Sequence, residues 1–146
     1  MYRKILVAID GSDHADHALI SAIETAAKWG AKLVILTVIS PLSPFVYSGE
    51  MDVDYIKKLE EELTEYHRKI IEEAAMKVKA TSPNVVFSTR LEEGRPATEI
   101  VETAKEEDVD LIVMGSRGLG GVTGLLLGST SRHVVETCTK PILIVK

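Results

Sequence analysis

The chain has 146 residues, 45% of them hydrophobic and 27% charged, and a formal net charge of −5. This size suits one domain over 1–146 with a core of its own, and the negative charge excludes a general nucleic-acid surface, which needs a positive field. The single cysteine rules out an intramolecular disulfide, and the lack of an apolar run long enough to span a bilayer leads us to expect a cytoplasmic protein with no membrane partner.

Two continuous apolar runs, 5–9 and 32–39, predict strands that are buried on both faces, as in a parallel sheet. Between them, alanine and leucine recur at three- and four-residue steps, which predicts an amphipathic helix. Ser12 or Asp13 can cap the start of this helix, and Gly30 is suited to its end. The small side chains on its apolar face indicate close packing on the sheet.

After the second apolar run, Pro41 and Pro44 interrupt regular secondary structure. We expect a flexible flap over 40–52 near the strand ends. A long amphipathic helix is predicted from 53 to about 80, with one apolar stripe and an opposite face rich in Lys and Glu. Such a charged face is typical of a solvated surface, and the alternative is a helix that binds a partner.

The last part of the chain continues the alternation of strands and helices. The run 85–91 alternates in polarity and predicts an edge strand, and Pro96 suits the start of a helix over 96–107. A strand at 110–114, a helix at 129–138 and a strand at 141–145 complete the series. The pattern predicts a three-layer α/β sandwich with a five-stranded parallel sheet.

The most informative segment is 111–131. It contains an apolar strand that ends at a glycine, then a loop rich in glycine, and then the sequence Gly-Ser-Thr-Ser at the start of a predicted helix. Glycines let main-chain N–H groups approach a ligand, and a helix start has unpaired N–H groups, so the arrangement predicts a phosphate site. It is no P-loop, because no lysine lies between Asp110 and Thr139. The first strand–helix turn, 10–13, also lacks the Rossmann glycines.

The spacing in this stretch is specific. Gly115 is followed after two residues by Gly118, and nine further residues lead to Gly128, Ser129 and Thr130. This spacing resembles that of the adenine-nucleotide-binding branch of the universal stress protein family, and the resemblance extends from the opening strand to the closing 140–145. It implies an adenine nucleotide alpha hydrolase-like fold with strand order 3-2-1-4-5. The site would then lie at the carboxyl ends of strands one and four.

The resemblance also implies which residues bind ATP or AMP. Arg117 offers a charged planar fork to phosphate oxygens, and the helix start at 129–131 offers hydroxyls and N–H groups. Asp10 can accept from ribose hydroxyls, help to hold Mg²⁺ or Mn²⁺ against the phosphates, or only order its own turn. The full implied set is Ala8, Asp10, Val38, Met114, Gly115, Arg117, Gly118, Gly128, Ser129, Thr130 and Ser131.

Two functions fit this site: a nucleotide-dependent regulator of a stress response, or a slow ATP hydrolase or phosphotransferase completed by a partner. Hydrolysis needs a residue that positions water, and the loop offers hydroxyls and one arginine but no carboxylate, Gln or Lys. We therefore expect at most weak ATPase activity and no catalytic residue. His14 and His17 are spaced like a metal pair but lack a third ligand, so we expect them to be solvated.

The final strand is an uncharged apolar strand at a predicted sheet edge, which proteins usually cover or pair. The family pairs this strand with its equivalent in a second subunit, so the resemblance implies a homodimer. The alternative is an edge that is blunted by its flanking Lys140, Pro141 and Lys146. The residues of the predicted interface are Ile142, Leu143, Ile144 and Val145.

Overall fold

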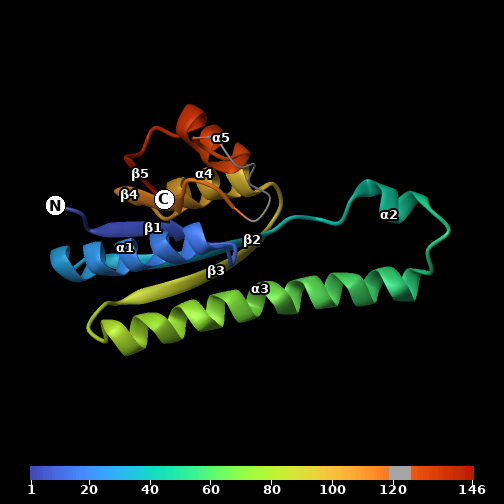
Figure 1. The fold of residues 1–146 in the computed structure, drawn as a ribbon, viewed down its shortest axis with the longest axis horizontal. Helices are drawn as coiled ribbons and strands as arrows, with labels where there is room; N and C mark the ends of the chain where they lie inside the picture. Colours follow the sequence, from blue (N-terminus) through green and yellow to red (C-terminus); the bar gives the residue numbers. More distant parts are fainter. Residues whose placement is uncertain (119–125) are drawn as a thin grey trace.

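The computed structural model describes residues 1–118 and 126–146, and in them strands and helices alternate along the chain (Figure 1). The part of the predicted glycine-rich loop at 119–125 lies outside the described residues. Each predicted element is present within two residues of its expected bounds. The strands are β1 (Lys4–Ala8), β2 (Lys32–Ile39), β3 (Phe87–Glu93), β4 (Leu111–Gly115) and β5 (Ile142–Val145). The helices are α1 (Asp13–Trp29), α2 (Pro44–Ser48), α3 (Val53–Thr81), α4 (Pro96–Glu106) and α5 (Ser129–Thr137).

The sheet has the predicted order β3-β2-β1-β4-β5, and all four pairings are parallel. Ile5 lies opposite Leu33 on one side and opposite Leu111 on the other. The three inner strands are covered on both faces, which explains why their sequences are continuous apolar runs. β3 lies at an edge, as its alternating pattern predicts.

Helices cover both faces of the sheet, α1 and α3 on one side and α4 and α5 on the other (Figure 1). α1 presents alanines to β1 and β4, so its axis can approach the sheet closely. The Ser12 hydroxyl accepts from the Ala15 N–H at 3.2 Å and caps the helix, which settles the choice between Ser12 and Asp13. Gly30 ends it at a φ of 63°, the left-handed conformation expected of a glycine there.

An acidic side chain joins the amino ends of β1 and β4. Asp110 Oδ2 accepts from the main-chain N–H groups of Arg3 at 2.7 Å and Lys4 at 3.0 Å. These two hydrogen bonds, that of Arg3 first, hold the pKa of the Asp110 carboxyl below its ordinary value. The carboxylate form therefore stabilises the pairing of two strands whose carboxyl ends form the site.

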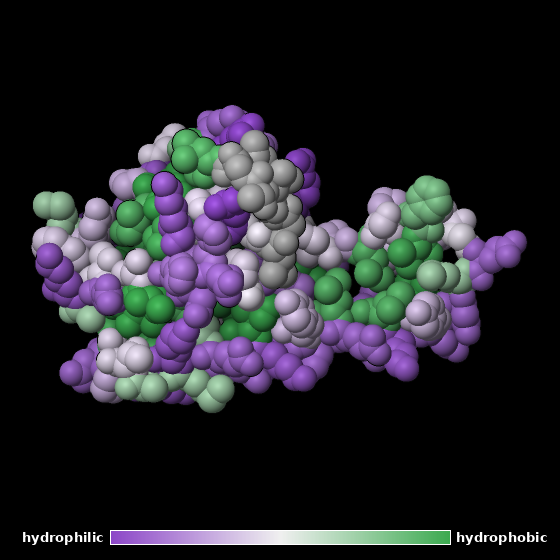
Figure 2. Space-filling view, viewed as in Figure 1, coloured by the Kyte–Doolittle hydropathy of each residue, from purple (hydrophilic) through white to green (hydrophobic). Residues whose placement is uncertain are grey.

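The segment between β2 and the middle of α3, residues 41–62, projects away from the sheet and is called the arm here (Figure 1). The prediction of a loop over 40–52 is wrong at Pro44–Ser48, where Ser43 caps the short helix α2. The apolar stripe of α3 is buried only at Ile71, Ala74 and Val78. On the arm, apolar side chains gather at the surface (Figure 2), with Phe45 85% and Val53 75% exposed.

Candidate functional site

A cavity of about 390 Å³ opens at the carboxyl ends of β1, β2 and β4, a size that suits a small-molecule ligand. All the residues implied by the resemblance line it: Ala8, Asp10, Val38, Met114, Gly115, Arg117, Gly118, Gly128, Ser129, Thr130 and Ser131. Their role in binding a ligand stays a prediction. Further lining residues, which the sequence analysis did not single out, are Ile9, Ala15, Leu36, Ser40, His67, Pro96 and Ile100.

The end of β4 lies so close to α1 that only glycine fits at residue 115. A Cβ on Gly115 would lie 2.8 Å from the His14 Cβ and 2.9 Å from the His14 main-chain carbon. The same histidine then contacts the next residue, with 2.9 Å between His14 Nδ1 and Ser116 Oγ. The expectation that both histidines are solvated is confirmed for His17, which is exposed although its Nδ1 lies 2.9 Å from the main-chain oxygen of Lys146. It is wrong for His14, which is half-buried against Ser116.

Ser116 links β4 to the start of α5 through its main chain. Its carbonyl accepts from the Gly128 N–H at 2.7 Å and from the Ser131 hydroxyl at 2.8 Å. A Cβ on Gly128 would lie 3.3 Å from Arg117 Cα, so this crossing is also tight. Ser131 is only 2% exposed, and its hydroxyl proton is used within the protein, so of the three hydroxyls at 129–131 it is the least able to donate to a ligand.

Two features of this region suit an anion. Among the described residues, no side chain caps α5, whose first-turn N–H groups lie at the positive end of the helix dipole. Arg117 Nε is buried, and within the described part of the chain it has no hydrogen-bond partner. A buried donor of this kind costs free energy unless a ligand accepts from it, so the arrangement fits a phosphate.

Asp10 orders the other side of the cavity. Its Oδ1 accepts from the Ser12 N–H at 3.0 Å, and a Cβ on Gly118 would collide with its Oδ2. The glycine at 118 therefore lets the loop after β4 reach the carboxylate at the end of β1. Among the described residues, no three His, Cys, Asp or Glu side chains gather to hold a metal ion. A cation at Asp10 would thus need further ligands, such as phosphate oxygens.

Among the described lining residues, His67 is the one titratable residue that the sequence analysis did not assign to the site. It lies on α3, where a charged helix face predicted only solvated residues, and it reaches the cavity because α3 passes over the turn between β1 and α1. Local periodicity shows which face of a helix is apolar, but not which other segments the helix packs against. The pattern around His67 therefore contains no signal that this residue lies at the cavity.

The fold and the cavity define an α/β protein of the adenine nucleotide alpha hydrolase-like class. The solved structure of the universal stress protein UspA from Lactobacillus plantarum superposes with a TM-score of 0.85, at 25% identity, covering 99% of this chain and 98% of that one. The model of the universal stress protein family matches residues 1–146. The chain belongs to this family.

Individual relatives agree over the whole length. The universal stress protein YxiE of Bacillus subtilis is 41% identical over 153 aligned residues, covering all of both chains. MJ0577 of Methanocaldococcus jannaschii is 34% identical and is covered to 96%, and its solved structure has a TM-score of 0.83. A universal stress protein solved in complex with cAMP is 31% identical, with a TM-score of 0.74 and coverage of 99% of this chain and 97% of that one. Of the helices in 1–118 and 126–146, none is both long and apolar enough to cross a bilayer.

Proposed function

We infer that this chain binds an adenine nucleotide, ATP or AMP, in the cavity and acts as a nucleotide-dependent regulator of a stress response. Within 1–118 and 126–146, no side chain caps the start of α5 and the buried Arg117 Nε beside it has no hydrogen-bond partner, and this observation carries the proposal. The cAMP complex of a relative supports adenine nucleotides as the ligand class. The predicted cytoplasmic location belongs to the same proposal.

The lining suggests how the nucleotide lies. Leu36, Val38 and Ile100 form an apolar region suited to the adenine ring, and Arg117 with the start of α5 suits the phosphates. Asp10 lies between these regions, where its carboxylate can accept from the ribose. If Mg²⁺ or Mn²⁺ accompanies the nucleotide, we expect Asp10 and the phosphates to hold it jointly.

We also infer a homodimer through β5. The carbonyls of Pro141 and Val145 accept from N–H groups on the β4 side, so the main-chain groups of the intervening even-numbered residues, Ile142 and Ile144, face the open edge. Leu143 is 40% exposed on this strand. An apolar strand with an unpaired edge supports pairing with a second copy.

The first experiment is mass spectrometry of any nucleotide released when the purified protein is denatured, with titration of added ATP alongside. We expect an adenine nucleotide from the parent chain and none from Gly128→Val, because the valine would crowd Arg117 and the start of α5. Gly49→Val is the matched control, since Gly49 lies on the arm, where a Cβ would meet Phe45 O at 3.6 Å and no other atom of the described residues within 4 Å.

The outcomes separate the functions. A parent that carries no nucleotide and does not bind added ATP would refute the proposal. ADP or AMP alone, in protein loaded with ATP, would favour the slow hydrolase instead. Loss of nucleotide from both glycine variants would show that the effect of Gly128→Val is not local.

A further inference from the structure

α3 passes directly over the turn that follows β1. A Cβ on Gly11 would lie 3.1 Å from Ile70 Cδ1 and 3.4 Å from the Tyr66 hydroxyl, so this part of α3 covers the residue next to Asp10. His67 lies between these two residues in sequence and lines the cavity together with Asp10, Val38 and Ser40. The helix therefore brings an imidazole to the Asp10 side of the cavity.

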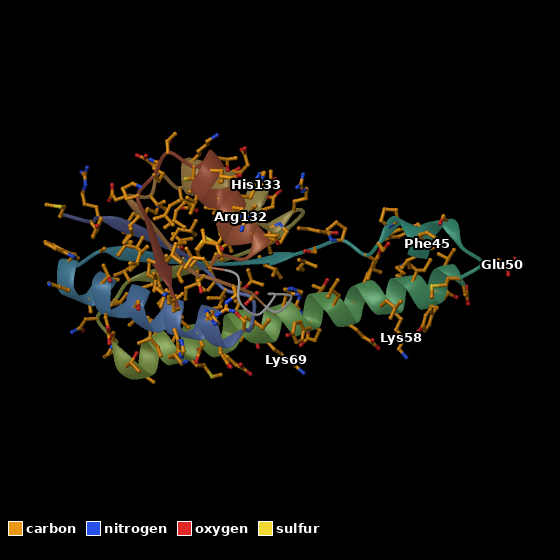
Figure 3. All side chains as sticks on the ribbon, turned by 45° about the horizontal axis from the view of Figure 1, so that its top comes forward. Phe45, Glu50, Lys58, Lys69, Arg132 and His133 are labelled. Carbon is orange, nitrogen blue, oxygen red and sulfur yellow. The ribbon has the colours of Figure 1, made fainter. Side chains whose placement is uncertain are left out.

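The phosphate side of the cavity belongs to the opposite layer. Figure 3 shows Lys69 on α3 and Arg132 and His133 on α5, separated by the sheet. Ile70 of α3 packs with the cluster on the α1 face, whereas Val134 of α5 belongs to the cluster on the other face. His67 thus approaches a ligand from the side away from the start of α5.

The hydrogen bond of His67 fixes what its ring can offer. Nδ1 lies 2.8 Å from the Leu63 carbonyl, which can only accept, so Nδ1 carries the proton. The ring also packs edge-to-face with Tyr66, at 5.3 Å between centroids and 86° between planes. In the neutral ring, Nε2 then has a lone pair, and the described residues give this atom no hydrogen bond. His67 thus lines the cavity with a ring whose Nδ1 is occupied and whose Nε2, in the neutral form, is an acceptor.

We propose that His67 Nε2 accepts a hydrogen bond from a ribose hydroxyl and makes the site select ribonucleotides over deoxyribonucleotides. This inference rests on the proposed nucleotide function. In the neutral ring, Nε2 cannot pair with a phosphate oxygen, because both atoms are then acceptors. Ribose hydroxyls are donors, and this part of α3 covers Gly11, which directly follows Asp10, the acceptor assigned to the same sugar. A removed hydroxyl leaves one acceptor unpaired, which weakens binding.

The test compares dissociation constants for ATP, 2′-deoxy-ATP, 3′-deoxy-ATP and ITP by calorimetry. Wild type should bind ATP roughly two- to tenfold more tightly than at least one deoxy analogue, the range expected for one neutral hydrogen bond. His67→Asn keeps an amide near the Nδ1 position but has nothing at Nε2, so its preference for ribose should fall to about one. His67→Gln places an acceptor near Nε2 and should restore much of the preference.

His133→Asn is the matched control, because His133 lies on α5 outside the cavity lining and its variant should keep the wild-type preference. An unchanged ratio of deoxy-ATP to ATP affinity in His67→Asn would overturn the inference while leaving nucleotide binding intact. A change confined to the ratio of ITP to ATP would also overturn it, since His67 would then contact the base. Failure of wild type to bind ATP at all would instead refute the proposed function, and this inference with it.

Discussion

The crowding at Gly115 can be tested by a single methyl group. In Gly115→Ala the new Cβ would lie 2.8 Å from His14 Cβ, 2.9 Å from the His14 main-chain carbon and 3.1 Å from the Ala15 nitrogen. Comfortable contacts between carbon atoms are about 3.5–4.0 Å. Two of the three obstructing atoms are main chain, so no side-chain rotation relieves them and α1 must move off the sheet. Overpacking costs about 1–3 kcal/mol, and we place this substitution near the upper end, at about 3 kcal/mol.

Gly30→Ala is the control for this experiment. Gly30 has a φ of 63°, but none of the described residues lies within 4 Å of its Cβ position, so the substitution meets the cost of a left-handed backbone, about 1 kcal/mol. Both changes restrict the unfolded chain alike, so that contribution cancels from the comparison. Urea unfolding should show that Gly115→Ala loses about 2 kcal/mol more than Gly30→Ala. An equal or greater loss in Gly30→Ala would refute the claim that the approach of α1 demands glycine at 115.

Three further predictions concern stability and assembly. Asp110→Asn should lower the free energy of unfolding by about 1 kcal/mol at pH 7. Because folding lowers the pKa of the Asp110 carboxyl, its contribution to stability is present above about pH 4 and is lost as the pH falls. A difference in unfolding free energy between wild type and Asp110→Asn that is equal at pH 7 and pH 3 would contradict this prediction. Leu143→Lys should convert a dimer to a monomer in light scattering, and a dimer that persists would argue against β5 as the interface. Ser131→Ala should cost about 1 kcal/mol by removing the buried hydrogen bond to Ser116, whereas Ser129→Ala, at an exposed position, should leave the melting temperature unchanged.

The sequence allowed the sheet to be predicted because its signals are local and repeated. Continuous apolar runs favour strands that are buried on both faces, and helices between the strands favour parallel pairing, so β1 and β2 could be placed inside the sheet. The strand order itself came from the resemblance to the family, as did the assignment of residues to the cavity.

Features that depend on what an element packs against could not be predicted. The apolar stripe of α3 looks the same along its length, yet only its second half meets the sheet. His14 and His67 appear as polar residues on helix surfaces, but one contacts Ser116 and the other reaches the cavity. Both contacts join residues far apart in the chain or across layers, and helical periodicity carries no information about them.

Ser116 is a junction of four chain segments. Its N–H donates to Val145 at the end of β5, its carbonyl accepts from Gly128 and Ser131 at the start of α5, and its hydroxyl contacts His14 of α1. The predicted phosphate wall and the predicted dimer strand therefore share one residue. If a nucleotide shifts this residue on binding, it changes the free energy of strand pairing, and thermodynamic reciprocity requires dimerisation to change nucleotide affinity by the same factor. A higher protein concentration, which favours the dimer, would then change the nucleotide affinity of the site as an allosteric effector does.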